Sequence, residues 1–165
     1  MTATAVYSSI ACLHTLFETQ AARTPTAHAV TFEHDHLTYQ DLNERANQLA
    51  HHLLHLGIQP GTLVGLCVER SLDMVVGILG ILKAGGAYVP LDPVYPPDRL
   101  SFMIEDTQVP VVVTQSHLAA NLPASARLLH LDTESTTIAR ESSANPASAV
   151  TSAHPAYVIY TSGST

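Results

Sequence analysis

The chain has 165 residues, of which 46% are hydrophobic and only 13% are charged. This composition is typical of a globular domain with a sizeable core and excludes a disordered chain. The formal net charge is −7, with only seven Lys and Arg residues. Since these few basic residues form no stripe, we expect no nucleic-acid partner.

The sequence predicts a cytoplasmic protein without membrane contact. No basic residue precedes Arg23, which argues against a secretory signal or a transit peptide. The longest apolar run, residues 74–82, is too short to span a bilayer. Cys12 and Cys67 lie far apart and form no metal-binding pair, so we interpret them as reduced thiols rather than a disulfide.

We interpret residues 1–12 as a leader and residues 13–165 as one domain. Apolar residues in the segment 13–23 recur at helical spacing and predict a first helix. Residues 29–32 are β-prone and predict a strand, and residues 33–36 have the composition of a tight turn.

The clearest predicted helix covers residues 38–56. Thr38 and Asp41 have the spacing of a capping box, in which each residue satisfies a backbone N–H of the other. Gly57 is a natural stop. One apolar stripe runs along the helix and consists of Leu42, Ala46, Leu49, Leu53 and Leu56.

Two apolar segments follow. Residues 63–68 form a continuous apolar run, which is typical of a strand covered on both faces. Residues 71–84 are apolar nearly all round and predict a buried helix, in which Gly77 and Gly80 allow close packing against the sheet. Lys83 is interpreted as a helix C-terminal lysine that suits the helix dipole.

The second half of the chain continues the alternation of strands and helices. Strands are predicted at residues 87–91, 109–114 and 127–131. A helix that begins with two prolines is predicted at residues 96–106, and a short helix at residues 116–121.

Residues 141–153 are small and polar and predict a linker, after which residues 156–160 predict a strand. The alternation as a whole indicates an α/β fold with a mainly parallel sheet and helices on both faces. In such sheets ligands lie beyond the carboxyl ends of the strands, where residues 161–165 would follow the strand at 156–160.

The last five residues are the candidate ligand-binding residues: Thr161, Ser162, Gly163, Ser164 and Thr165. Hydroxyl groups donate hydrogen bonds to phosphate oxygens, and a glycine allows backbone N–H groups to turn toward the same anion. The alternative is a plain turn, which has a similar composition. The segment lacks the two glycines and the lysine of a Walker-type loop.

Histidines invite a metal hypothesis. His51, His52 and His55 lie together on the helix over residues 38–56, but on the face opposite the apolar stripe. No HExxH pattern is present, so we interpret them as solvated surface residues. His34 and His36 flank the predicted turn and receive the same interpretation.

No catalytic triad can be assembled from the sequence. Ser162 and Ser164 lack the GxSxG frame of a nucleophile elbow. Asp92 is interpreted as a turn residue, and Asp98 as a favourable charge in the first turn of a helix. We therefore assign no catalytic residue and no metal ligand.

Three motifs together resemble the adenylation domains of nonribosomal peptide synthetases, a branch of the adenylate-forming superfamily. Residues 37–42, LTYQDL, resemble the first core motif, with Asp41 where the family usually has Glu. Residues 82–93, LKAGGAYVPLDP, resemble the second and most discriminating motif. Residues 157–165, YVIYTSGST, are similar to the start of the phosphate loop. The resemblance extends from about residue 13 to the end.

The resemblance implies a fold and a reaction. The family uses ATP and Mg²⁺ to convert an amino acid into an aminoacyl adenylate, and transfers it to the phosphopantetheine of a peptidyl carrier domain. Residues 161–165 match the loop that binds the ATP phosphates, whereas the second motif is mainly structural. A C-terminal adenylation subdomain is a further expected partner.

Much of the family's machinery would lie beyond residue 165. We therefore expect a fold truncated within the phosphate loop and a chain that is inactive by itself, with its amino acid and peptide product undefined. Two alternatives are a fragment of an acyl-CoA or aryl-acid ligase, against which the second motif argues, and a non-catalytic truncated protein that binds a partner.

Overall fold

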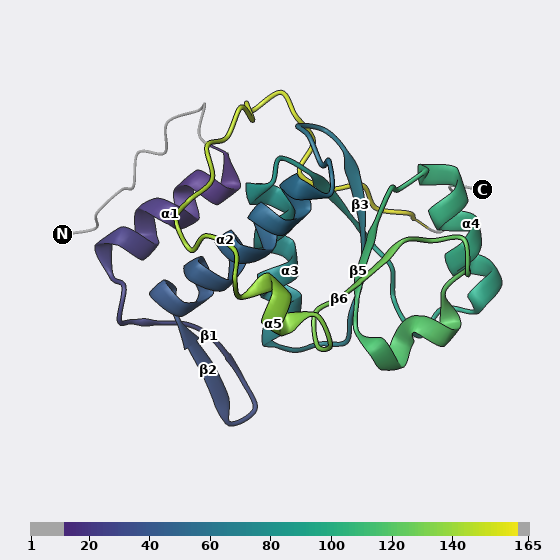
Figure 1. Ribbon diagram of the computed structural model, residues 1–165, viewed down its shortest axis with the longest axis horizontal. Coiled ribbons are helices and arrows are strands. Elements are labelled where there is room, and N and C mark those ends of the chain that lie inside the picture. Colours follow the sequence, from purple (N-terminus) through teal and green to yellow (C-terminus); the bar gives the residue numbers. More distant parts are fainter. Residues whose placement is uncertain (1–11, 162–165) are drawn as a thin grey trace.

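A four-stranded parallel sheet lies at the centre of residues 12–161, the part of the chain that the computed structural model describes (Figure 1). Its strands lie in the order β4-β3-β5-β6. They comprise β3 (Leu63–Cys67), β4 (Ala87–Pro90), β5 (Val112–Thr114) and β6 (Leu128–His130). The predicted α/β class and the parallel sheet are thus confirmed.

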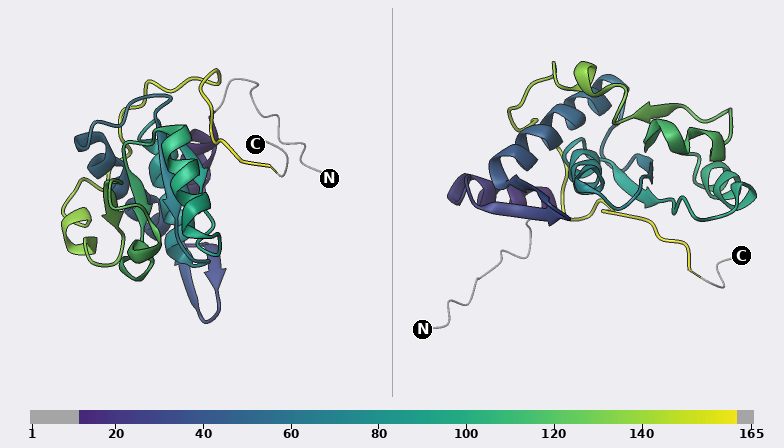
Figure 2. Two further views of the ribbon diagram at one scale, coloured as in Figure 1. Left: turned by 90° about the vertical axis from the view of Figure 1, so that its right-hand side faces the viewer. Right: turned by 90° about the horizontal axis from the view of Figure 1, so that it is seen from below.

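A separate antiparallel hairpin, β1 (His28–Phe32) and β2 (Asp35–Thr38), projects away from the rest of the fold (Figure 2). The predicted strand at residues 29–32 is confirmed as β1. The predicted turn at 33–36 was too long, because Asp35 and His36 already pair with β1. The turn consists of Glu33 and His34, with Glu33 at a φ of 54°.

Helix α1 (Leu13–Arg23) has the predicted bounds and follows Cys12 as its N-cap. Helix α2 (Tyr39–His55) begins with the predicted capping box. The backbone N–H of Asp41 donates to Thr38 Oγ1 at 3.1 Å, and that of Thr38 donates to Asp41 Oδ2 at 3.3 Å. The shorter aspartate therefore serves as well as the usual glutamate.

Helix α3 (Leu72–Lys83) lies between the sheet and α2, and two of its glycines allow it to pack closely against both. A Cβ on Gly77 would lie 2.8 Å from Leu66 Cδ1 in β3, so this glycine allows the predicted approach to the sheet. A Cβ on Gly80 would lie 2.6 Å from Leu49 Cδ2 in α2. Gly80 thus permits contact with the neighbouring helix, and not with the sheet as the sequence suggested.

Each face of the sheet has its own apolar core, because neighbouring side chains of a strand point to opposite faces. Val113 packs with residues of α2 and α3, and Val112 packs with residues of α4 (Pro97–Thr107). The continuous apolar run at residues 63–68 is explained in the same way, since both of its faces are covered.

The remaining elements are short. Residues 116–121 form the predicted helix as a 3-10 helix, η1 (Ser116–Asn121), and α5 (Ser135–Ile138) was not predicted. Within residues 12–161, none of the helices combines the length and apolar character that crossing a bilayer would need.

Residues 139–154, which we call the strap, run along the outside of the helices toward the edge of the sheet (Figure 1). The predicted linker at residues 141–153 lies in this strap and contains neither helix nor strand. The strap is nevertheless closely packed: Gln48 Nε2 donates to Ala139 O at 3.0 Å, and Asn47 Nδ2 to Ser143 O at 2.7 Å.

Candidate functional site

The segment that leads to the candidate loop lies beside the edge strand β4. The backbone N–H of Tyr88 donates to Ala156 O at 3.1 Å, and that of Val158 donates to Tyr88 O at 3.0 Å. These bonds form one parallel bridge between Tyr88 and Tyr157, so the strand predicted at residues 156–160 is reduced to a single bridge. Pro90 contributes to this, since residue 90 of β4 would be the next to donate to this segment and a proline has no N–H.

Because the bridge is parallel, the residues after it run toward the carboxyl edge of the sheet. Tyr160 fixes this end of the segment: its hydroxyl donates to Asp106 Oδ2 on α4, and its ring centroid lies 6.3 Å from that of Phe102. Desolvation, together with the Asp106 carboxylate that accepts the hydrogen bond, raises the pKa of Tyr160 to about 12. Thr161 follows directly at this edge.

A cavity of about 830 Å³ opens at the same edge, beyond the ends of β3 and β4. Ile159 and Tyr160 line one side of it, and its charged lining residues are Glu69, Arg70 and Asp92. Its position agrees with the rule that ligands of parallel α/β sheets bind beyond the carboxyl ends of the strands.

Two aspartates near this edge have the structural roles that the sequence predicted. Asp92 Oδ1 accepts a hydrogen bond from the backbone N–H of Val94 at 3.0 Å, which is turn chemistry. Asp98 lies in the first turn of α4.

Of the five candidate loop residues, Thr161 alone belongs to the described part of the chain, where it is exposed. Ser162, Gly163, Ser164 and Thr165 lie outside the described residues. Their binding of phosphate stays a prediction. The structure does place the hydroxyl-bearing Thr161 next to a segment held by β4 and α4.

Sequence reasoning missed the role of Lys83. It is the last residue of α3, as predicted, but only 1% of it is exposed. Its Nζ lies 2.5 Å from Glu18 Oε1 on α1 and 5.9 Å from the ring centroid of Phe17. Burial lowers the pKa of Lys83, and the hydrogen bond and charge of Glu18 oppose that change.

Of the histidines of α2, His55 is exposed, with 70% of its side chain accessible, as the sequence suggested, whereas His52 is largely covered, with 15% accessible. His52 Nδ1 and His55 Nδ1 lie 3.3 and 3.1 Å from Glu141 Oε1, so both rings contact the strap. His51 Nε2 lies 3.0 Å from Ala144 O of the same segment. The hydrogen bond from His55 is the main reason that the pKa of Glu141 is lowered.

No group of three or more His, Cys, Asp or Glu residues able to hold a metal ion occurs within residues 12–161. In the hairpin, the ring of His36 stacks on that of His28 with 3.9 Å between centroids. His34 and His36 are both exposed, as the sequence suggested.

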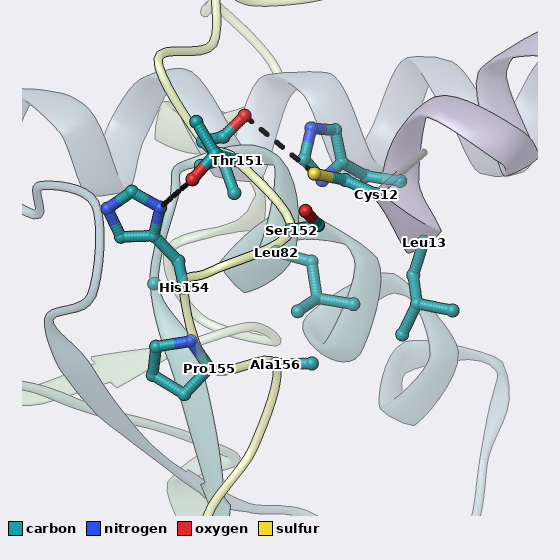
Figure 3. Close-up of a pocket in the computed structure, with 11 residues that line it drawn as sticks. Cys12, Leu13, Leu82, Thr151, Ser152, His154, Pro155 and Ala156 are labelled. Carbon is teal, nitrogen blue, oxygen red and sulfur yellow. Dashed lines mark hydrogen bonds between the residues drawn. The ribbon is translucent and has the colours of Figure 1, made fainter. Parts of the chain in front are cut away.

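A smaller cavity of about 170 Å³ lies where the strap crosses the start of α1 (Figure 3). Cys12 Sγ donates a weak hydrogen bond to Val150 O at 3.7 Å, and the backbone N–H of Thr151 donates to His154 Nδ1 at 3.1 Å. Cys12 and Cys67 are both free thiols, as predicted. Burial raises the pKa of Cys67 to about 11, which leaves it protonated and unreactive.

Residues 17–165 match the sequence profile of the family described as "AMP-binding enzyme". The chain belongs to this family. The curated relatives that it resembles include tyrocidine synthase 3 of Brevibacillus parabrevis, with 51% identity over 155 residues. Bacitracin synthase 1 of Bacillus licheniformis is 50% identical over 154 residues. Each match covers 93% of this chain, but the chain spans only 2% and 3% of these two relatives.

Solved structures give the same assignment. The nonribosomal peptide synthetase FmoA3 superimposes with a TM-score of 0.88 at 37% identity, over 96% of this chain and 17% of that one. An FmoA3 structure in an AMPPNP-bound form gives the same TM-score at 36% identity. The N-terminal subdomain of Klebsiella oxytoca NpsA, at 20% identity and a TM-score of 0.77, shares the fold.

Proposed function

We propose that this chain is part of an amino-acid-activating adenylation domain of a nonribosomal peptide synthetase. In that reaction the amino acid carboxylate attacks the α-phosphorus of ATP, and pyrophosphate leaves. The phosphopantetheine thiol of a carrier domain then attacks the aminoacyl carbon, which forms a thioester and releases AMP. The chain spans a few per cent of its synthetase relatives, so the activity is proposed for the longer enzyme.

The observation that carries this proposal is the geometry of residues 82–93. Lys83 closes the buried helix α3, and Gly85, with φ of +92°, turns the chain so that β4 can follow at once. Strand β4 then carries the bridge at Tyr88, which aligns the segment that ends at Thr161. The motif that distinguishes peptide synthetases thus supports the segment that is predicted to bind ATP.

In this proposal the hydroxyl of Thr161, with the hydroxyls and backbone of residues 162–165, binds the ATP phosphates. Such donors stabilise the charge that develops on the phosphoryl oxygens during transfer. Two FmoA3 structures are described as bound to AMPPNP and to an α-methyl-L-serine adenylate. Those ligands agree with an adenylate-forming reaction in this chain's family.

Mg²⁺ is expected to accompany ATP, because it usually binds through substrate phosphates and few carboxylates. Residues 12–161 offer no preformed group of metal ligands. The phosphates of bound ATP would therefore supply most of the Mg²⁺ ligands.

The test is amino-acid-dependent exchange of pyrophosphate into ATP by the complete enzyme, measured against a panel of amino acids. Exchange with one or a few amino acids supports the proposal. Activation of fatty or aryl acids with no response to amino acids would support the acyl-CoA or aryl-acid ligase instead. We expect no exchange from the 165-residue chain alone, and exchange by that chain would contradict this part of the proposal.

A further inference from the structure

Three side-chain nitrogens converge on one oxygen of the strap, Asn145 Oδ1. Lys83 Nζ lies 3.4 Å from it, and Asn43 Nδ2 and Asn47 Nδ2 each lie 3.0 Å from it. An ammonium group can only donate hydrogen bonds, so the oxygen and not the nitrogen of the Asn145 amide faces Lys83. The two asparagines of α2 must then present their nitrogens as well.

This arrangement is costly for the fold. Lys83 is 1% exposed and Asn47 is fully buried. With their nitrogens turned toward Asn145, Asn43 Oδ1 and Asn47 Oδ1 have no hydrogen-bond partner among the described residues. Buried charges and unpaired amide oxygens generally destabilise a protein relative to apolar packing. The network does, however, define one position of the strap relative to α2 and α3.

The strap leads directly from this network to the candidate site. Pro146, the next residue, is buried, whereas most of residues 147–153 are exposed. Cys12 Sγ contacts Val150 O at 3.7 Å, and backbone hydrogen bonds to β4 follow at Ala156 and Val158, which both bond to Tyr88. The position of Asn145 therefore limits how far the chain can reach toward β4, and with it the registers that the bridge can adopt.

We infer that Lys83 and Asn145 are positioning residues for ATP binding. They hold the strap so that residues 156–158 meet Tyr88 in one register and Thr161 emerges at the carboxyl edge of the sheet. The inference rests on the proposed function, because it takes residues 161–165 as the phosphate loop. In this inference the role of Lys83, in the LKAGG sequence of residues 82–86, is to hold the strap through Asn145.

The test compares three variants of the complete adenylation enzyme. Asn145→Ala removes the shared oxygen and should raise KM for ATP about ten-fold, with KM for the amino acid changed less than about two-fold, since small misplacements of binding groups have effects of this size. Asn145→Asp keeps an oxygen opposite Lys83 and should retain most of the ATP affinity. Ser143→Ala is the matched control, because Ser143 contacts Asn47 through its backbone oxygen, which the substitution leaves in place.

A second measurement is independent of catalysis. Hydrogen exchange at the Val158 amide reports the bond to Tyr88 O directly, and it should become faster in Asn145→Ala but not in Ser143→Ala. A purely structural role would lower the melting temperature and leave both KM values and this exchange rate unchanged, which would overturn the inference.

The two proposals fail in different ways. If the parent enzyme shows no amino-acid-dependent exchange of pyrophosphate into ATP, the proposed function fails, and the positioning role in ATP binding fails with it. Faster hydrogen exchange at the Val158 amide in Asn145→Ala would then show that Asn145 sets only the register of the bridge to Tyr88. If the parent enzyme is active but Asn145→Ala keeps its KM for ATP, the positioning inference alone is wrong.

Discussion

Lys83 and Glu18 form an ion pair between α3 and α1, with 2.5 Å between Nζ and Oε1, although the lysine side chain is fully buried. The pair joins helices whose sequences are far apart, and Glu18 itself is largely covered, with 19% of its side chain exposed. Such a pair contributes little net stability when intact, but losing one partner leaves a charge buried without a counter-ion.

Glu18→Gln should therefore lower the free energy of unfolding by about 3 kcal/mol, the lower end of the range for breaking a buried ion pair. Urea denaturation of the purified protein measures this loss. Glu105→Gln replaces an exposed glutamate on α4 and is the control, with an expected change within about 0.5 kcal/mol.

The stability that Glu18→Gln loses relative to the parent should depend on pH. Burial lowers the pKa of Lys83, so the folded protein binds fewer protons than the unfolded chain between this lowered pKa and the ordinary value of 10.5. Stability then rises with pH in that window. In Glu18→Gln the charged lysine has no counter-ion, and this penalty disappears once the lysine loses its proton. The difference in stability between the variant and the parent should therefore shrink as pH approaches 10.5. A loss that does not vary with pH would contradict the buried charge.

Gly80 makes the contact between α2 and α3 possible. An added Cβ would lie 2.6 Å from Leu49 Cδ2, and Leu49 is itself fully buried, so the clash has little room to relax. We expect Gly80→Ala to destabilise the protein by about 2 kcal/mol, as overpacking of a core does.

A double-mutant cycle tests this explanation. Leu49→Ala alone should cost about 3 kcal/mol because it leaves a cavity, but the combination with Gly80→Ala should cost less than the sum. Additive losses would show that Gly80 is required for a reason other than this contact.

Local sequence patterns predicted the elements that depend on local chemistry. The capping box of Thr38 and Asp41 and the apolar stripe of α2 lie within a few turns of one helix, and the structure confirms both. The parallel sheet also followed from the alternation of strands and helices, since a parallel connection needs a crossover.

The contacts that the sequence did not predict join distant residues. Lys83 resembled any helix-end lysine, because its partner Glu18 is 65 residues away. His52 looked solvated but is largely covered, because nothing in its own helix shows that Glu141 would lie against it. Residues 156–160 had strand composition, but the length of a strand is decided by its partner, and here one bridge to Tyr88 forms.

The contact of Glu141 with His52 and His55 predicts a pH dependence of the strap. Hydrogen bonds from the two histidines lower the pKa of Glu141 below its ordinary value of 4.5. The folded state thus binds fewer protons, so the contribution is present above pH 4.5 and is lost as pH falls through the lowered pKa.

Glu141→Gln should therefore be less stable than the parent near neutral pH, and the difference should disappear at the acidic end of the folded range. Thermal melts across pH measure it. Glu44→Gln, whose carboxylate accepts only from Gln40 on the same helix among the described contacts, should show no such convergence.

Tyr160 should be recognisable by its titration. Desolvation and the hydrogen bond to Asp106 raise its pKa to about 12, above the ordinary value of 10. Folded protein then keeps the phenol proton longer than unfolded chain does, so this contribution to stability is present below pH 10 and is lost as pH rises toward 12.

Ultraviolet absorbance of tyrosinate measures the effect in the chain's six tyrosines. The parent should show a phase near pH 12 that is missing in Tyr160→Phe and still present in Tyr95→Phe. Asp106→Asn should move that phase toward pH 10, because the acceptor then carries no charge. If the phase stays in Tyr160→Phe, the hydroxyl does not bond to Asp106, and the segment before Thr161 is held by the bridge to Tyr88 and the packing of its rings alone.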